Sequence, residues 1–187
     1  AEAVLAGGQF GGPELEQATE RLERLPHGDD PVLELILDLA VGAATSLRGT
    51  ATEPIQVSEA TIEEVAQVAT SPLDLFWAGR GFFMIGRNLE ASRVARRAID
   101  IARDGEATGL LPQLLRLRAA ADYDRGEWLA ARAAASEAAD LAEELGQTTT
   151  ACACLGLLAE LESALGKGTR VSVVLEHALV HEAVPAA

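Results

Sequence analysis

The sequence repeats itself at a distance of 40 residues. The segment GRNLEASRVARRAIDIARDGE begins at Gly86, and GEWLAARAAASEAADLAEELG begins at Gly126. In the same register Pro72 falls on Pro112, and the turn glycine recurs once more at Gly166. Similarity at a fixed period of this length is the signature of a repeat array in which neighbouring units stack.

A stripe of small residues follows the turn glycines Gly86 and Gly126. Its alanines recur at i, i+4, i+7 and i+11, so they share one face of a helix, where short side chains let two helices approach closely. A single helix pair cannot cover its own apolar face, which is why such pairs stack. The positions assigned to repeat packing are Gly79, Gly86, Ala91, Ala98, Ala119, Gly126, Ala131, Ala138, Ala159, Gly166 and Ala178.

Pro, Gly and polar turns divide the chain into nine predicted helices. No segment alternates like a strand, and aromatic residues make up only 4% of the sequence, so we expect an all-α fold. Either Ser58, or Thr61 with Glu64, could cap the third helix. The predicted helices are 13–25, 31–47, 58–68, 71–86, 89–103, 112–126, 128–145, 149–165 and 169–184.

These helices predict an antiparallel helix-pair superhelix, an α-solenoid with a period of about 40 residues. We expect less regular hairpins of the same array in residues 1–70. Three regular pairs then follow, at 71–108, 109–147 and 148–187.

The charge balance argues against direct nucleic-acid binding. The formal net charge is −14 and Lys167 is the sole lysine, whereas a phosphate backbone requires a positive surface. The arginines between Arg87 and Arg132 are interleaved with carboxylates. No apolar run reaches the ~20 residues of a membrane span, and no basic and apolar leader precedes the first helix, so a cytoplasmic location is expected. The chain begins with Ala1, and we expect a longer native polypeptide.

The spacing within each unit resembles the tetratricopeptide helix pair. A Leu precedes a small residue by four positions, a turn Gly follows that residue by seven, and small residues return after twelve and nineteen. The family period is 34 residues rather than 40, and the closing Pro is missing. The matches are Leu75, Gly79, Gly86, Ala91 and Ala98, then Leu115, Ala119, Gly126, Ala131 and Ala138, then Leu155, Ala159, Gly166 and Ala178, with Val171 replacing a small residue in the third unit.

Residues 70–166 also resemble the helical-repeat region of large ATP-binding regulators of the LuxR family, of the MalT-like type. The sequence motifs that carry this resemblance are GLLP before a repeat and LAEELGQ after one. In that family the repeat region lies between a nucleotide-binding module and a helix-turn-helix domain. The resemblance implies that ATP and DNA bind to separate domains, and no cofactor is expected in this segment.

Aromatic residues and arginines gather on the first helix of the repeated pairs. In helix-pair solenoids the first helices line the concave surface, where partners and ligands bind. One interpretation is therefore a groove for a protein or small-molecule effector. The alternative is that most of these aromatics belong to the core. The groove would contain Trp77, Arg80, Phe83, Arg116 and Tyr123.

No other motif predicts a nucleotide-binding, metal-binding or catalytic site. LGKGT at 165–169 lacks the first Gly and the Ser/Thr of a phosphate loop and follows a helix, and GGQFGGPE at 7–14 lacks its Lys. His177 and His181 lie one turn apart but lack further metal ligands. Cys152 and Cys154 point apart on a helix, so we interpret them as reduced thiols. No catalytic residues and no metal site are predicted, and the chain is not expected to be an enzyme.

Two functions remain open from the sequence. The first is the sensor or autoinhibitory arm of a cytoplasmic LuxR-type transcriptional regulator. The second is a freestanding tetratricopeptide-like scaffold for protein–protein interaction. The sequence is compatible with a homo-oligomer in either case.

Overall fold

The computed structural model describes residues 30–47, 57–105 and 107–167, together with positions 21, 24 and 171. Within these residues it contains seven α-helices, one short 3₁₀ helix and no strand, which confirms the all-α prediction for them. Apart from positions 21, 24 and 171, the predicted helices 13–25 and 169–184 lie outside the described residues. Ala178 and the three histidines also lie outside them. The elements are α3 (Pro31–Leu47), α4 (Glu59–Val68), α5 (Pro72–Met84), α6 (Asn88–Asp104), η1 (Thr108–Leu110), α7 (Leu111–Asp124), α8 (Trp128–Glu144) and α9 (Thr148–Ala164).

The starts of α4 and α5 follow the capping chemistry of the sequence. The Ser58 hydroxyl accepts a hydrogen bond from the Thr61 backbone N–H at 3.3 Å, so Ser58 caps α4 and the alternative capping box at Thr61 does not. Ser71 caps α5 in the same way, and a proline follows in the first turn, where its missing N–H has no helical partner. The connection from α6 to α7 contains the short helix η1.

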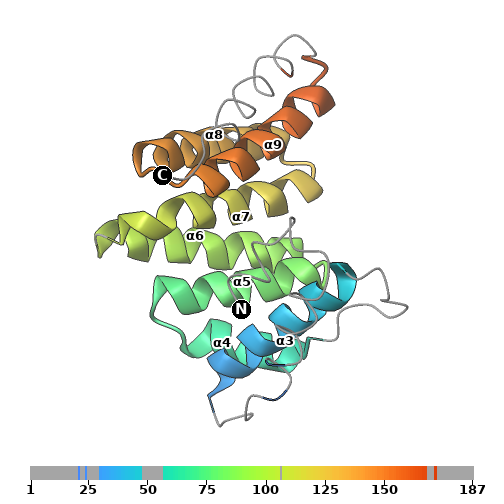
Figure 1. Ribbon diagram of the computed structural model, residues 1–187, viewed down its shortest axis with the longest axis vertical. Helices are drawn as coiled ribbons and strands as arrows, with labels where there is room; N and C mark the ends of the chain where they lie inside the picture. Colours follow the sequence, from blue (N-terminus) through green and yellow to red (C-terminus); the bar gives the residue numbers. More distant parts are fainter. Residues whose placement is uncertain are drawn as a thin grey trace.

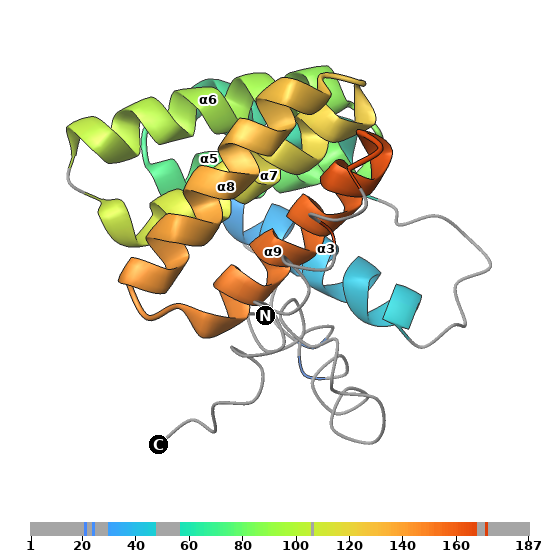
Figure 2. The same ribbon diagram turned by 90° about the horizontal axis from the view of Figure 1, so that it is seen from above.

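From α4 to α9, each helix packs against the next in the chain. Figure 1 shows the helices following one another along the long axis, with α3 and α4 at one end and α8 and α9 at the other. The first helices of the predicted pairs also contact one another, α5 with α7 and α7 with α9. Viewed along that axis, α6 lies on one side of the molecule, and α3 and α9 lie on the other (Figure 2). We call the side formed by α5, α7 and α9 the first-helix face.

The same helix-ending turn occurs three times at the repeat distance, and we call it the glycine joint. Gly86, Gly126 and Gly166 have φ angles of 77°, 78° and 72°, a left-handed conformation that only glycine adopts without strain. The N–H after each glycine donates to a carbonyl five residues earlier, on Phe82, Asp122 and Glu162, at 2.8 to 2.9 Å. This is the Schellman arrangement that ends a helix. Gly146, which the sequence analysis did not single out, forms a similar joint between α8 and α9.

Small side chains fill the seams between the helices. The alanine stripes of α6 and α8 have no exposed surface, and Gly79, Ala119 and Ala159 are buried on α5, α7 and α9. Leucines without exposed surface, such as Leu75 and Leu115, complete the core. The stripes are Ala91, Ala95, Ala98 and Ala102 on α6, and Ala131, Ala135, Ala138 and Ala142 on α8.

Among the helices described, none combines the length and the apolar character needed to cross a membrane.

Two helical glycines give a matched test of this packing. A Cβ on Gly81 would lie 2.9 Å from Cγ1 of Ile62, a fully buried and stiff side chain, whereas a Cβ on Gly156 meets nothing within 4 Å. Both substitutions to alanine improve helix propensity by about 1 kcal/mol, but overpacking costs about 1–3 kcal/mol. We expect Gly156→Ala to stabilise the protein and Gly81→Ala to be less stable than Gly156→Ala by about 2 kcal/mol in urea denaturation. Equal stability of the two variants would contradict the tight α4–α5 contact.

Candidate functional site

The five residues predicted to line a groove lie on two neighbouring helices. Trp77, Arg80 and Phe83 are on α5, and Arg116 and Tyr123 are on α7. All five are half-buried. The three aromatic side chains pack against the hydrophobic core, so they belong to it in part, as the alternative interpretation expects.

Arg80 and Arg116 lie where α5 and α7 approach closely. A Cβ on Gly79 would lie 2.9 Å from Cδ2 of Leu117, so these two positions face each other across the seam. Arg80 follows Gly79 and Arg116 precedes Leu117. Burial, and then the charge of Arg116, lowers the pKa of Arg80 from its usual range. An arginine remains protonated at neutral pH despite such a shift, so two like charges share this part of the first-helix face.

Neither of these arginines forms a hydrogen bond or an ion pair within the described part of the chain. Seven other arginines do have polar partners there, and these partners are carboxylates or backbone carbonyls. The paired arginines are Arg87, Arg96, Arg97, Arg103, Arg118, Arg125 and Arg132.

A thiol lies within the electrostatic reach of Arg116. Cys154 on α9 has no exposed surface, and its burial raises the pKa of the thiol to about 11, although the charge of Arg116 acts in the opposite direction. The thiolate is the reactive form of cysteine, so Cys154 is inert at neutral pH.

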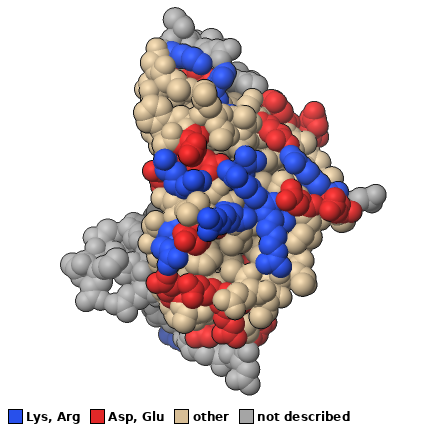
Figure 3. Space-filling view, turned by 180° about the vertical axis from the view of Figure 1, so that it is seen from behind, with Lys and Arg blue, Asp and Glu red and all other residues tan. Residues whose placement is uncertain are grey.

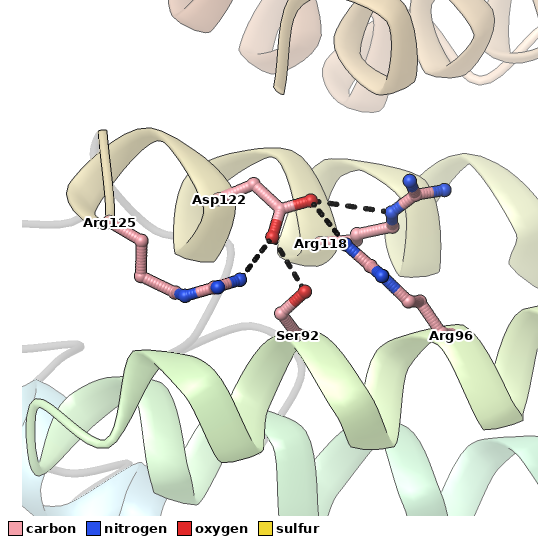
Figure 4. Close-up of polar contacts among 5 residues, drawn as sticks. All are labelled: Ser92, Arg96, Arg118, Asp122 and Arg125. Carbon is pink, nitrogen blue, oxygen red and sulfur yellow. Dashed lines mark hydrogen bonds and ion pairs between the residues drawn. The ribbon is translucent and has the colours of Figure 1, made fainter. Parts of the chain in front are cut away.

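The paired arginines gather around a buried carboxylate at the contact of α6 with α7. Asp122 on α7 has no exposed surface and accepts a hydrogen bond from the Ser92 hydroxyl on α6 at 2.6 Å. Nη1 of Arg125 donates to the same carboxylate oxygen at 3.0 Å. Figure 4 shows both groups converging on Asp122, with Arg96 and Arg118 approaching from the other side. We call these five residues the Asp122 cluster.

The Asp122 cluster carries more positive than negative charge. Nη2 of Arg96 and Nε of Arg118 each lie 3.4 Å from Oδ2 of Asp122, so three guanidinium groups surround one carboxylate. All three arginines keep some solvent contact. Figure 3 shows Lys and Arg side chains gathered near the middle of one face of the molecule, with Asp and Glu among and around them.

The next repeat places a second buried carboxylate in the same position. Glu162 lies 40 residues after Asp122, is also buried, and forms an ion pair with Nε of Arg132. Arg132 in turn lies 40 residues after Ser92. In both cases a polar residue of a second helix holds a carboxylate 30 residues later, on the first helix of the next pair.

These carboxylates were absent from the sequence analysis, although a signal existed. In the repeat register Asp122 and Glu162 fall on Phe82, whose side chain is buried. A carboxylate at a position that is apolar in another repeat indicates a buried ion pair, because an unpaired buried charge is strongly unfavourable.

Other arginine contacts fasten α4 to α6. Arg97 donates to the carbonyls of Ala66 and Ala69 at 2.9 and 2.8 Å, which satisfies carbonyls at the C-terminal end of α4. Arg87 pairs with both Glu59 and Glu90. These contacts are structural, since both partners belong to the chain itself.

A shallow hollow of about 290 Å³ lies between α4, α5 and α6. Its wall contains Phe82 and the charged residues Glu63, Glu90 and Arg93. None of the five predicted groove residues lines it. Among the described residues, no three His, Cys, Asp or Glu side chains are grouped so that they could hold a metal ion.

Comparison with known proteins found no matching family model, curated protein or solved structure.

Removing the Asp122 carboxylate should destabilise the protein. In Asp122→Ala, Ser92 and three arginines lose their common acceptor. Breaking a buried pair costs about 3–5 kcal/mol, and we expect about 3 kcal/mol because the arginines retain solvent contact. Asp100→Ala, which removes an exposed carboxylate of α6 outside the cluster, should change stability by no more than about 0.5 kcal/mol. Urea denaturation followed by circular dichroism measures both, and equal effects would show that the Asp122 cluster does not hold α6 to α7.

The raised pKa of Cys154 predicts slow alkylation. At pH 8 a thiol with a pKa of about 11 is only about 0.1% thiolate, and the reactive fraction rises about tenfold for each pH unit up to the pKa. Burial slows the reaction further. Mass spectrometry after iodoacetamide treatment of the folded chain should therefore find Cys154 unmodified at pH 8 and labelled after denaturation. Rapid labelling of the folded protein would contradict the buried environment.

Proposed function

We propose that this chain is a binding module built as a tetratricopeptide-like α-solenoid. Three features support this architecture: the recurring glycine joint, the alanine stripes at the same register, and the contacts of α5 with α7 and α7 with α9. Such arrays bind ligands along the surface formed by the first helices. The first-helix face is therefore the binding face in this proposal.

One observation carries the proposal of a binding role. Arg80 and Arg116 are half-buried, repel each other and have no partner within the described residues, whereas the seven paired arginines named above have partners in the chain. Buried charges are normally paired, because removal from water is costly. A pair of like charges without a counter-charge among the described residues is expected where a ligand supplies one.

We propose further that the module is the sensor arm of a LuxR-type transcriptional regulator. Support comes from the resemblance of residues 70–166 to the repeat region of MalT-like regulators. ATP and DNA would bind to separate domains of the longer polypeptide. This segment would not bind DNA itself, since its net charge is −14 and many of its arginines are already paired.

The mechanism in this proposal is a population shift. An effector that contacts both α5 and α7 favours the arrangement of neighbouring pairs that it fits best, because a ligand shifts an equilibrium by its difference in affinity. That preference passes along the stacked helices to the nucleotide-binding module. The contacts around Asp122 and Glu162 keep each pair attached to the next while this happens.

A freestanding scaffold is the second candidate, and exposed apolar residues favour it. Trp128 and Leu129 at the start of α8 are 41% and 73% exposed, and Leu89 occupies the position equivalent to Leu129 on α6. Exposed apolar surface is one mark of a protein-binding site. In this version the partner would be a peptide or protein, with no small effector.

The test uses the native polypeptide rather than the segment alone. The regulator proposal predicts a phosphate loop upstream, a helix-turn-helix domain downstream, and effector-dependent transcription from a reporter. Arg80→Glu should abolish induction by reversing the charge of the binding face, while the protein stays folded. Arg103→Glu on α6 is the matched control and should induce normally.

Two results would reject the regulator proposal. One is a native polypeptide without DNA-binding activity, which would leave the scaffold. The other is normal induction by both Arg80→Glu and Tyr123→Ala in a folded protein.

A further inference from the structure

The pair formed by Arg80 and Arg116 has no counter-charge among the described residues, in a chain that is rich in carboxylates. The sequence has 29 acidic and 15 basic residues, yet no described carboxylate pairs with either guanidinium. The Asp122 cluster shows the opposite arrangement, with a buried carboxylate among three arginines. The difference between the two groups indicates different roles, structural for the cluster and open to a ligand for the pair.

We propose that Arg80 and Arg116 together bind the oxyanion group of a small effector, either a phosphate or a carboxylate. This inference rests on the proposed function in one respect, because both place the ligand on the first-helix face.

The chemistry of the two side chains fits this ligand class. A guanidinium presents its N–H groups as a planar fork that matches the spacing of two oxygens in a carboxylate or phosphate. Two forks on neighbouring helices can hold one anion between them. The bound negative charge would also offset the repulsion between the arginines, and partial burial strengthens each contact because screening by water is reduced.

The neighbouring aromatics suit the remainder of a small molecule. Trp77 precedes Arg80 by three residues, and Tyr123 follows Arg116 by seven, so each lies on the same side of its helix as the arginine. Both residues are half-buried. They would provide an apolar wall beside the charged group.

A small anion fits this site better than an extended polyanion. Two arginines match one oxyanion, whereas a nucleic acid or an acidic peptide needs a row of cations. The net charge of −14 repels a polyanion at long range. A single oxyanion is held mainly by short-range contacts.

Thermal denaturation of the 187-residue chain with inorganic phosphate or citrate provides the test, with sodium chloride at matched ionic strength as the reference. Phosphate or citrate should raise the melting temperature in a saturable way, and chloride should not. Whichever of phosphate and citrate binds more tightly identifies the oxyanion as a phosphate or a carboxylate. Arg80→Gln and Arg116→Gln should each weaken binding about tenfold or more, since each removes charge-assisted hydrogen bonds. Arg103→Gln, which replaces an exposed arginine that pairs with Glu137, should bind like the unmodified chain.

Several outcomes overturn the proposal. One is that chloride stabilises the protein as much as phosphate and citrate do, and another is that neither anion binds in a saturable way. A third such outcome is that the Gln variants bind the anion as tightly as the unmodified chain. A hexaglutamate peptide that binds through these arginines when the small anions do not would assign the face to an acidic protein partner instead.

Stability without the anion separates a binding pair from a structural one. In phosphate-free buffer Arg116→Gln should be at least as stable as the unmodified chain, because it removes repulsion with Arg80. Unfolding of this variant would show that the arginines serve the fold and would overturn the proposal. The result does not depend on flanking domains, so failure of the regulator proposal and failure of anion binding are distinguishable.

Discussion

The close approach of helices along the alanine seams is the constraint on which the rest of the structure depends. Side chains such as Ala98 and Ala138 have no exposed surface, and they are the equivalent positions of two units. Short side chains permit a small distance between helix axes, and that distance places groups on neighbouring helices within hydrogen-bonding reach. The contact between Ser92 and Asp122 requires this proximity, because both side chains are short.

Asp122 and Glu162 connect the turn with the packing of one pair on the next. The backbone carbonyl of each accepts the hydrogen bond that closes the glycine joint, and the side chain of each binds a polar group of the preceding second helix. The same residue therefore takes part both in the turn that ends its helix and in the attachment of that helix to its neighbour. Because both residues lie at the same repeat position, the two attachments are equivalent. Arg80 and Arg116, on the same first helices, take no part in these contacts.

The sequence predicted the elements well because their determinants are local. Ser58, Ser71 and the turn glycines act within a few residues, and they set the helix ends that the structure has. The repeat register also identified the buried alanines, since a stripe at helical spacing needs no knowledge of the partner helix. In contrast, the polar contacts are set between residues about 30 positions apart, such as Arg132 and Glu162, and depend on which faces meet.

The arginines show most clearly what sequence alone cannot resolve. Arg80, Arg116 and Arg118 all lie on first helices among apolar residues, and nothing in the local pattern separates them. The structure places Arg118 against Asp122, whereas the other two lie beside each other and have no partner in the part of the chain that is described. The aromatic residues were equally ambiguous, and the half-buried Trp77 and Tyr123 satisfy part of both interpretations, core and groove.

A comparison of two leucine substitutions on α8 tests the seam most directly. Ala138 is fully buried at the seam, whereas Ala133 on the same helix is exposed. The account predicts that Ala138→Leu lowers the free energy of unfolding by about 1–3 kcal/mol or more through overpacking, and that Ala133→Leu changes it by no more than about 0.5 kcal/mol. Ala98→Leu, at the equivalent position of α6, should behave like Ala138→Leu. Equal tolerance of leucine at Ala138 and Ala133 would contradict a close-packed seam and the repeating architecture built on it.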